Sequence, residues 1–305
     1  MNKPIALSLM LILVAGMAIA QEGKQPGRKT GPSNPPPTYA DIKYGPYARN
    51  VMDVWLAKSD KPTPVLVSIH GGGFSGGNKS VGPWILAECL QSGISVVAIT
   101  YRFSQDAIAP ASFLDSARAI QFIRSKAKEW NLDPTRVADT GGSAGAGISL
   151  WLRFHDDLAN PKSEDPVLRQ STRLTCMFVF DGQSSYDPRF IRDLFPGSDT
   201  YKIGALAKLY DIDPNHLDHL PKEKYKLFEE CSPITHLTKD DAPAMLIYGR
   251  TMDSAADIHH PRFGKVLKEK MDALGIECKF YAGRPEQGES RESPIAFVKR
   301  HFGMK

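Results

Sequence analysis

Gly141-Gly142-Ser143-Ala144-Gly145 is the stretch that decides the fold of this 305-residue chain. It matches Gly-x-Ser-x-Gly, a pattern in which a serine occupies a sharp turn between a strand and a helix and its neighbours must lack bulk. The weakly apolar run 136–140 precedes the turn, and the largely apolar run 146–154 follows it. The sequence therefore predicts a strand, a tight turn and a buried helix, with the Ser143 hydroxyl at the tip of the turn.

A second glycine-rich motif lies about seventy residues earlier. His70-Gly71-Gly72-Gly73-Phe74 directly follows the apolar run 64–69. Glycines after a strand let backbone N–H groups face a developing negative charge without a Cβ in the way. A glycine-rich turn can occur for structural reasons alone, but its position upstream of Ser143 favours a loop that stabilises an oxyanion.

Composition limits the classes of function that the chain could have. Hydrophobic residues make up 42% of the chain and charged residues 24%, as in an ordinary globular domain with one large core. The formal net charge is +4 and the basic residues do not cluster, so we expect neither a nucleic-acid partner nor a membrane-binding patch. No Cys/His spacing resembles a zinc site, and no metal or other cofactor is expected. Pairing of the four cysteines stays open; they are Cys89, Cys176, Cys231 and Cys278.

The first residues carry the features of an export signal. Lys3 supplies a positive charge, residues 5–17 are mostly apolar, and Ala18-Ile19-Ala20 has the small-x-small form of a cleavage site. We predict a signal peptide over 1–20, with an uncleaved anchor as the alternative, and hence a secreted or periplasmic protein without stable membrane insertion. A Pro/Gly-rich linker over 21–38 is expected to lead into a folded domain over 39–305.

Strands and helices are expected to alternate along this domain. Such alternation predicts a three-layer α/β fold, with a mostly parallel sheet of about eight strands and helices on both faces. The irregular segment 183–238 is expected to be an inserted cap over the strand ends, or else a variable surface insertion. The expected strands are 51–56, 64–69, 95–100, 136–140, 176–180, 244–249 and 278–281, and the expected helices are 84–90, 113–127, 146–154, 201–210, 222–231, 260–274 and 295–302.

From Tyr39 to Phe302 the chain resembles the α/β-hydrolases, in particular the branch of acetyl xylan and feruloyl esterases and hormone-sensitive-lipase-like carboxylesterases. The resemblance implies that Ser143 is the nucleophile and that the N–H groups of Gly72, Gly73 and Ala144 form the oxyanion hole. It also implies an acid on the loop after strand 244–249. Asp253 fits that position best, and Asp257 is the alternative. The matching motifs are 70–74, Tyr101-Arg102, 133–137 and Ser232-Pro233-Ile234.

The histidine that this family places after the last strand is missing. The corresponding segment, 284–291, contains no histidine, and Gln287 before Gly288 stands at the expected position. Glutamine cannot take a proton from serine at neutral pH. We expect His260 to be the base, with His259 as the alternative, because both lie at the start of the helix that follows the acid loop. Less favoured candidates are His155, His216, His219, His236, His301, Glu286 and Glu289, and His70 is expected to shape the oxyanion loop.

Two functions remain open from the sequence. The first is a serine hydrolase that acts on carboxylic esters through an acyl-enzyme at Ser143, with a small-molecule or polysaccharide ester, such as a carbohydrate acyl ester, as substrate. The second is a binding protein of the same fold that has lost its triad histidine. A peptidase of the prolyl-oligopeptidase kind is a weaker third reading, since the chain has no large propeller domain. The sequence leaves the oligomeric state open.

Overall fold

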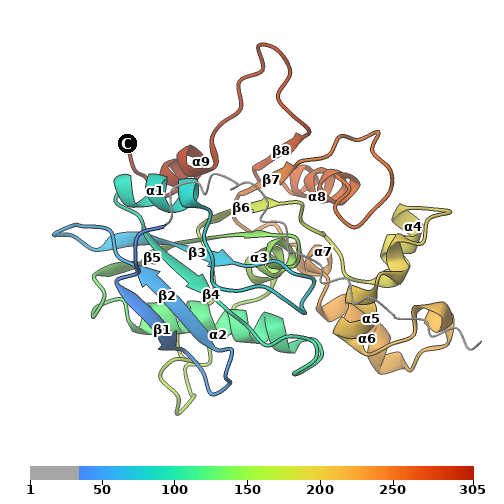
Figure 1. Cartoon of the computed structure of the whole chain (residues 1–305), viewed down its shortest axis with the longest axis horizontal. Coiled ribbons are helices and arrows are strands. Elements are labelled where there is room, and N and C mark those ends of the chain that lie inside the picture. Colours follow the sequence, from blue (N-terminus) through green and yellow to red (C-terminus); the bar gives the residue numbers. More distant parts are fainter. Residues whose placement is uncertain (1–33) are drawn as a thin grey trace, which may run out of the picture. The chain divides into compact units, whose positions relative to one another are not determined.

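The computed structural model describes residues 34–305, so the predicted signal peptide and residues 21–33 of the predicted linker lie outside the described residues. These residues contain a single eight-stranded sheet in the order β1-β2-β4-β3-β5-β6-β7-β8 (Figure 1). β2 runs antiparallel to β1 and β4, and every other neighbouring pair is parallel. The strands are β1 (Tyr39–Lys43), β2 (Val51–Trp55), β3 (Thr63–Ile69), β4 (Ser95–Ile99), β5 (Leu132–Gly142), β6 (Cys176–Phe180), β7 (Ala244–Tyr248) and β8 (Cys278–Ala282).

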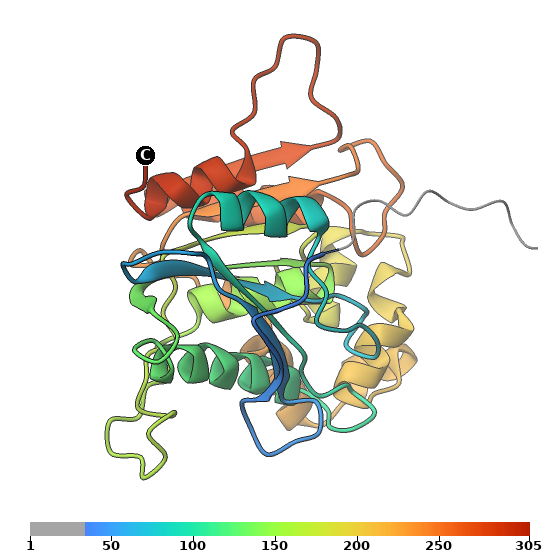
Figure 2. The same ribbon diagram turned by 60° about the vertical axis from the view of Figure 1, so that its left-hand side comes forward.

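Helices cover both faces of the sheet, which confirms the predicted three-layer architecture. α1 (Pro83–Gln91) and α9 (Pro294–His301) pack together against one face (Figure 2). The other face is covered by α2 (Ala111–Ser125), α3 (Ala144–Phe154) and α8 (Arg262–Ala273). The central strands are buried on both sides because each face is covered, and this explains their continuous apolar runs.

The strand that leads into the Ser143 turn is longer than the sequence predicts. β5 begins at Leu132 and continues to Gly142, although the residue types of Asn131-Leu132-Asp133-Pro134 are typical of a turn. Leu132 pairs with Thr63, and the register then shifts before Val65 pairs with Val137. This irregularity lets the strand pass through Pro134, a residue that cannot donate to the ladder.

The segment between β6 and β7 contains most of the chain's short helices, grouped together in Figure 1. The predicted helix over 222–231 corresponds to α6, and the one over 201–210 is divided between η1 and α5. The elements of this insertion are α4 (Pro188–Leu194), η1 (Thr200–Lys202), α5 (Gly204–Tyr210), η2 (Pro214–His219), α6 (Lys222–Glu230) and α7 (Pro233–His236).

All four cysteines are buried and unpaired, as expected for small side chains packed in a core. Of the helices within residues 34–305, none combines the length and apolar character needed to cross a bilayer.

Candidate active site

Ser143 occupies a strained turn between β5 and α3. Its backbone has φ 53° and ψ −121°, a conformation that costs free energy for a residue with a Cβ. The two motif glycines permit the turn: a Cβ on Gly141 would lie 2.4 Å from the Gly145 carbonyl carbon, and one on Gly145 would lie 2.1 Å from the Ile69 carbonyl oxygen. The Ser143 N–H donates to the Phe180 carbonyl at 3.0 Å, which ties the turn to the end of β6.

The Ser143 hydroxyl has a histidine within hydrogen-bond distance. Its Oγ lies 2.9 Å from Nε2 of His259, on the loop between β7 and α8. This is the geometry in which an imidazole can accept the serine proton. The backbone N–H of His259 donates to Oδ1 of Asp257 at 2.7 Å, and Oδ2 of Asp257 pairs with Arg250 at 2.5 Å. Asp257 thus holds the backbone beside the imidazole.

The structure places His260, the histidine preferred from the sequence, away from Ser143. His260 is 2% exposed, and its ring packs edge-on against Phe195. Its Nδ1 accepts from the Arg262 N–H at 3.0 Å, so Nε2 carries the proton and donates to the Ser254 carbonyl at 3.1 Å. The choice between the two histidines is therefore revised in favour of His259, because both nitrogens of His260 are used by the loop itself.

Neither predicted acid contacts the imidazole of His259. Asp253 is exposed, and the hydroxyl of Thr251 donates to its carboxylate, which lowers the pKa of Asp253. Asp257 touches the backbone of His259 but not its ring. Within residues 34–305, no carboxylate oxygen lies within 4.0 Å of either ring nitrogen of His259. The described site is a serine–histidine pair without an acid hydrogen-bonded to the imidazole.

The loop between β8 and α9, where the family resemblance places the base, projects away from the fold (Figure 2). Gln287 is exposed on this loop, as are Glu286 and Glu289. Arg291 donates to the Gly283 carbonyl at 2.8 Å and pairs with Glu289, and the ends of the loop are held by Tyr248 of β7 and Tyr281 of β8. The loop offers no base to Ser143.

The glycine-rich loop after β3 lies beside the nucleophile. Gly72, Gly73 and Ala144 line the same cavity as Ser143, and their N–H groups donate to no backbone carbonyl within the described part of the chain. Ala144 is the first residue of α3, so its N–H has no partner inside the helix. These three N–H groups, which the family resemblance assigns to the oxyanion hole, face the cavity without a backbone acceptor in the described residues.

His70, the first residue of the glycine-rich motif, connects this loop to Tyr101. Its ring stacks on Tyr101 with the centroids 4.3 Å apart, and Tyr101 donates its hydroxyl proton to the His70 carbonyl at 2.8 Å. Burial lowers the pKa of His70, which keeps the ring neutral while Nδ1 donates to the Gly71 carbonyl at 2.7 Å.

The cavity above Ser143 has a volume of about 330 Å³ and mostly apolar walls. One wall comes from the insertion, which brings the segment 203–206 within reach of anything bound at Ser143. The lining residues are Gly72, Gly73, Phe74, Ser143, Ala144, Gln183, Tyr186, Ile203, Ala205, Leu206, Ile258 and His259.

The sequence pattern did not reveal Gln183 or Tyr186, which hold the His259 loop in place. The Gln183 amide nitrogen donates to the carbonyls of Asp181 (2.9 Å) and Ile258 (2.7 Å), and Tyr186 donates its hydroxyl proton to the Gln183 side-chain oxygen at 3.0 Å. Gln183 is 2% exposed, so its side-chain amide is shielded from water. A polar residue three positions after the end of β6 was the available signal.

Comparisons with known proteins identify the family of the chain and similar proteins named as ester hydrolases. The family model described as BD-FAE matches residues 52–263, a span that includes both Ser143 and His259. A probable carboxylic ester hydrolase of Mycobacterium tuberculosis, LipM, is 28% identical over 228 residues, which are 73% of this chain and 49% of LipM. The chain spans about half the length of the curated relatives it matches most strongly.

Solved structures show the same fold. A truncated carbohydrate esterase from gut microbiota superimposes with a TM-score of 0.66 at 22% identity, covering 80% of this chain and 86% of that one. An acetyl ester-xyloside bifunctional hydrolase from Caldicellulosiruptor lactoaceticus gives a TM-score of 0.65 at 19% identity, covering 87% of this chain and 90% of the other. At these identities the likeness establishes the α/β-hydrolase fold and leaves the substrate to the site itself.

Proposed function

The chain belongs to the BD-FAE family, and from this membership and the geometry at Ser143 we propose that it is a serine hydrolase of carboxylic esters. The single observation that carries the proposal is the 2.9 Å separation between Ser143 Oγ and His259 Nε2. The pair lies in a cavity that is also lined by the free N–H groups of the glycine-rich loop. Nucleophile, base and oxyanion donors thus meet at one point.

Each half of the reaction uses the same groups. His259 Nε2 takes the proton of Ser143 as Oγ attacks the ester carbonyl carbon, and the N–H groups of Gly72, Gly73 and Ala144 stabilise the oxyanion. The intermediate collapses, the C–O bond to the alcohol breaks, and His259 returns its proton to the leaving oxygen. His259 then takes a proton from water as the water oxygen attacks the acyl carbon, the second intermediate collapses, and His259 returns this proton to Ser143 Oγ, which releases the carboxylic acid and free Ser143.

The cavity favours an ester with a small apolar group. Its volume of about 330 Å³ lies at the lower end of small-molecule sites, and Phe74, Tyr186 and Leu206 give it apolar walls. We propose carbohydrate acyl esters as the substrate class, with support from the two carbohydrate-active enzymes that share the fold. The predicted signal peptide over 1–20 further supports a secreted or periplasmic enzyme acting on external polysaccharide.

The binding-protein alternative rests on the histidine-free segment 284–291. A base supplied by a different loop removes that reason, so the hydrolase is the better supported function. The missing acid still lowers the expected rate. In a serine protease, replacing the triad aspartate by asparagine lowers kcat by about 10⁴, so we expect slow turnover with good labelling of the serine.

Covalent labelling tests the proposal directly. A fluorophosphonate probe should form an adduct on Ser143 that mass spectrometry localises, and a short-chain aryl ester should be hydrolysed at a rate that Ser143→Ala abolishes. Ser290→Ala is the matched control, since Ser290 is exposed and distant in sequence from the turn at Ser143. Absence of the adduct, together with equal turnover by wild type and Ser143→Ala, would overturn the proposal.

A further inference from the structure

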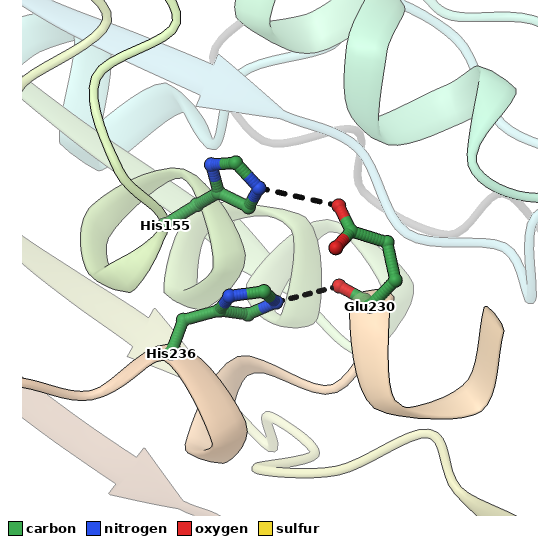
Figure 3. A group of neighbouring side chains, drawn as sticks. All are labelled: His155, Glu230 and His236. Atoms are coloured by element: carbon green, nitrogen blue, oxygen red, sulfur yellow. Dashed lines mark hydrogen bonds and ion pairs between the residues drawn. The ribbon is translucent and has the colours of Figure 1, made fainter. Parts of the chain in front are cut away.

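Two histidines and a glutamate lie close together at the C-terminal end of α3, the helix that begins directly after Ser143. His155 follows the last residue of α3, Glu230 ends α6, and His236 ends α7. One nitrogen from each imidazole and one oxygen of the Glu230 carboxylate all lie within 4.8 Å of one another, and the three side chains converge in Figure 3. His155 lies twelve residues after Ser143, about 18 Å along the helix, so the cluster is separate from the candidate active site.

The hydrogen bonds of His155 place both of its ring nitrogens next to acceptor oxygens. Its Nδ1 lies 2.9 Å from the Asp156 carbonyl oxygen, an acceptor, and must therefore carry a proton. Its Nε2 lies 3.2 Å from Oε1 of Glu230, another acceptor. A neutral imidazole has a single N–H, so the second contact needs either an added proton or a metal ion bound to the Nε2 lone pair.

The side chains are held in place by groups around them. The carbonyl oxygen of Glu230 accepts from both Trp151 Nε1 and His236 Nε2, each at 2.7 Å. The rings of Trp151 and His236 lie 4.3 Å and 4.7 Å from that of His155. Histidines that bind metals commonly donate their other ring N–H to a backbone carbonyl. Here a ring nitrogen of each histidine already makes such a contact.

We propose that His155, Glu230 and His236 bind one divalent transition-metal ion, with Zn²⁺ as the best match. Two imidazole nitrogens and one carboxylate oxygen suit Zn²⁺, whereas Mg²⁺ and Ca²⁺ prefer oxygen ligands. Tetrahedral bonds of about 2.0–2.2 Å require the ligand atoms to lie about 3.3–3.6 Å apart, so separations of up to 4.8 Å must shorten by up to about 1.5 Å. Water completes the coordination, because Glu230 is 43% exposed.

The consequence of such a site is structural. The ion would join α6 and α7, the last two helices of the insertion, to the helix that begins at the nucleophile turn. The insertion also supplies the 203–206 wall of the cavity. Metal binding would therefore stabilise the insertion against the sheet domain without taking part in ester chemistry.

The test uses the full protein without a polyhistidine tag, freed of metal by chelation and dialysis. Zn²⁺ titration followed by calorimetry should give one ion per chain and a raised Tm, Co²⁺ should give the visible absorption of a four-coordinate site, and Mg²⁺ should give neither. Glu230→Gln, which keeps the side-chain size, should weaken Zn²⁺ binding by on the order of 100-fold or more, since altering outer-shell partners alone costs 10–100-fold. His236→Ala should act in the same direction.

His216→Ala is the matched control, because His216 pairs with Asp213 on an exposed turn and lies outside the cluster. It should bind Zn²⁺ like wild type. Equal Zn²⁺ affinity in wild type, Glu230→Gln and His236→Ala would overturn the proposal, and so would an unchanged Tm with no stoichiometric binding in wild type. Circular dichroism checks that each variant is folded. Ser143→Ala should bind Zn²⁺ normally, which keeps this result independent of the esterase proposal.

Discussion

Ser143 Oγ lies 2.9 Å from Nε2 of His259, a residue that precedes α8 rather than α9. Ser143 is therefore paired with a histidine from the loop after β7, the loop on which the sequence predicts the acid. Although segment 284–291 contains no histidine, the Ser143 hydroxyl still has an imidazole within hydrogen-bond distance.

Replacing His259 should remove most of the ester hydrolysis. General-base catalysis typically contributes about 10²–10⁴ in rate, and we expect kcat of His259→Ala on a short-chain aryl ester to fall by at least 100-fold. His260→Gln should keep kcat within about threefold wherever it folds, because the His260 ring contacts Ser254 and Arg262 instead of Ser143. The opposite ranking of the two variants would show that the described loop conformation is not the active one.

The two candidate acids should differ in effect. Asp253→Asn should change kcat by less than about threefold, since its exposed carboxylate contacts Thr251. Asp257→Asn should lower kcat more, because Asp257 holds the His259 backbone and Arg250. Steady-state kinetics on both variants decide the point. A loss near 10⁴ for Asp253→Asn, the value typical of a triad acid, would show that Asp253 reaches the imidazole during turnover.

Placing a histidine at position 287, where the family resemblance expects the base, should not raise the rate of ester hydrolysis. Gln287 is exposed on the loop between β8 and α9, which projects away from the fold. We expect Gln287→His, and likewise His259→Ala combined with Gln287→His, to leave the rates of their parent proteins unchanged. Recovery of activity in the double variant would mean that this loop folds over Ser143.

Gln183 should be needed for both stability and rate. Gln183→Leu leaves the carbonyls of Asp181 and Ile258 and the hydroxyl of Tyr186 without partners, and each buried unsatisfied group costs about 1–3 kcal/mol. We expect a clear drop in Tm and about a tenfold loss in kcat in the folded fraction, since the His259 loop loses its anchor. Gln287→Leu is the matched control and should match wild type in both measurements.

The stability of the folded protein should fall with rising pH because the carboxyl group of Asp139 is buried in β5, the strand that leads to Ser143. Burial raises the pKa of Asp139 from 3.8 to about 8, although the charge of Arg153 opposes it. The folded protein then holds a proton that the unfolded chain releases, so the free energy of unfolding decreases between about pH 4 and pH 8 and levels off above that range.

Asp139→Asn has no such proton to lose. Urea unfolding at pH 5 and pH 8 should show wild type losing more stability than the variant, by at least about 1.4 kcal/mol, the value of one pKa unit. Parallel losses in the two proteins would show that Asp139 is charged in the folded state.

The sequence by itself determined the fold and identified Ser143 as the candidate nucleophile. Glycines at 141 and 145 are required by backbone contacts at the turn, and the alternation of apolar runs specifies a covered parallel sheet, so both can be read locally. For the base, the sequence left two adjacent candidates, His259 and His260. Neighbouring side chains on a loop point in different directions, and the local sequence pattern does not specify which of them faces Ser143.

Only the tertiary structure decided between them. His259 faces Ser143 because Asp257 fixes its backbone and Gln183 anchors the preceding carbonyl, while His260 turns into the core against Phe195. The His155–Glu230–His236 cluster likewise joins three helix ends from separate parts of the chain. Such contacts arise from how elements pack, and no spacing along the chain records them.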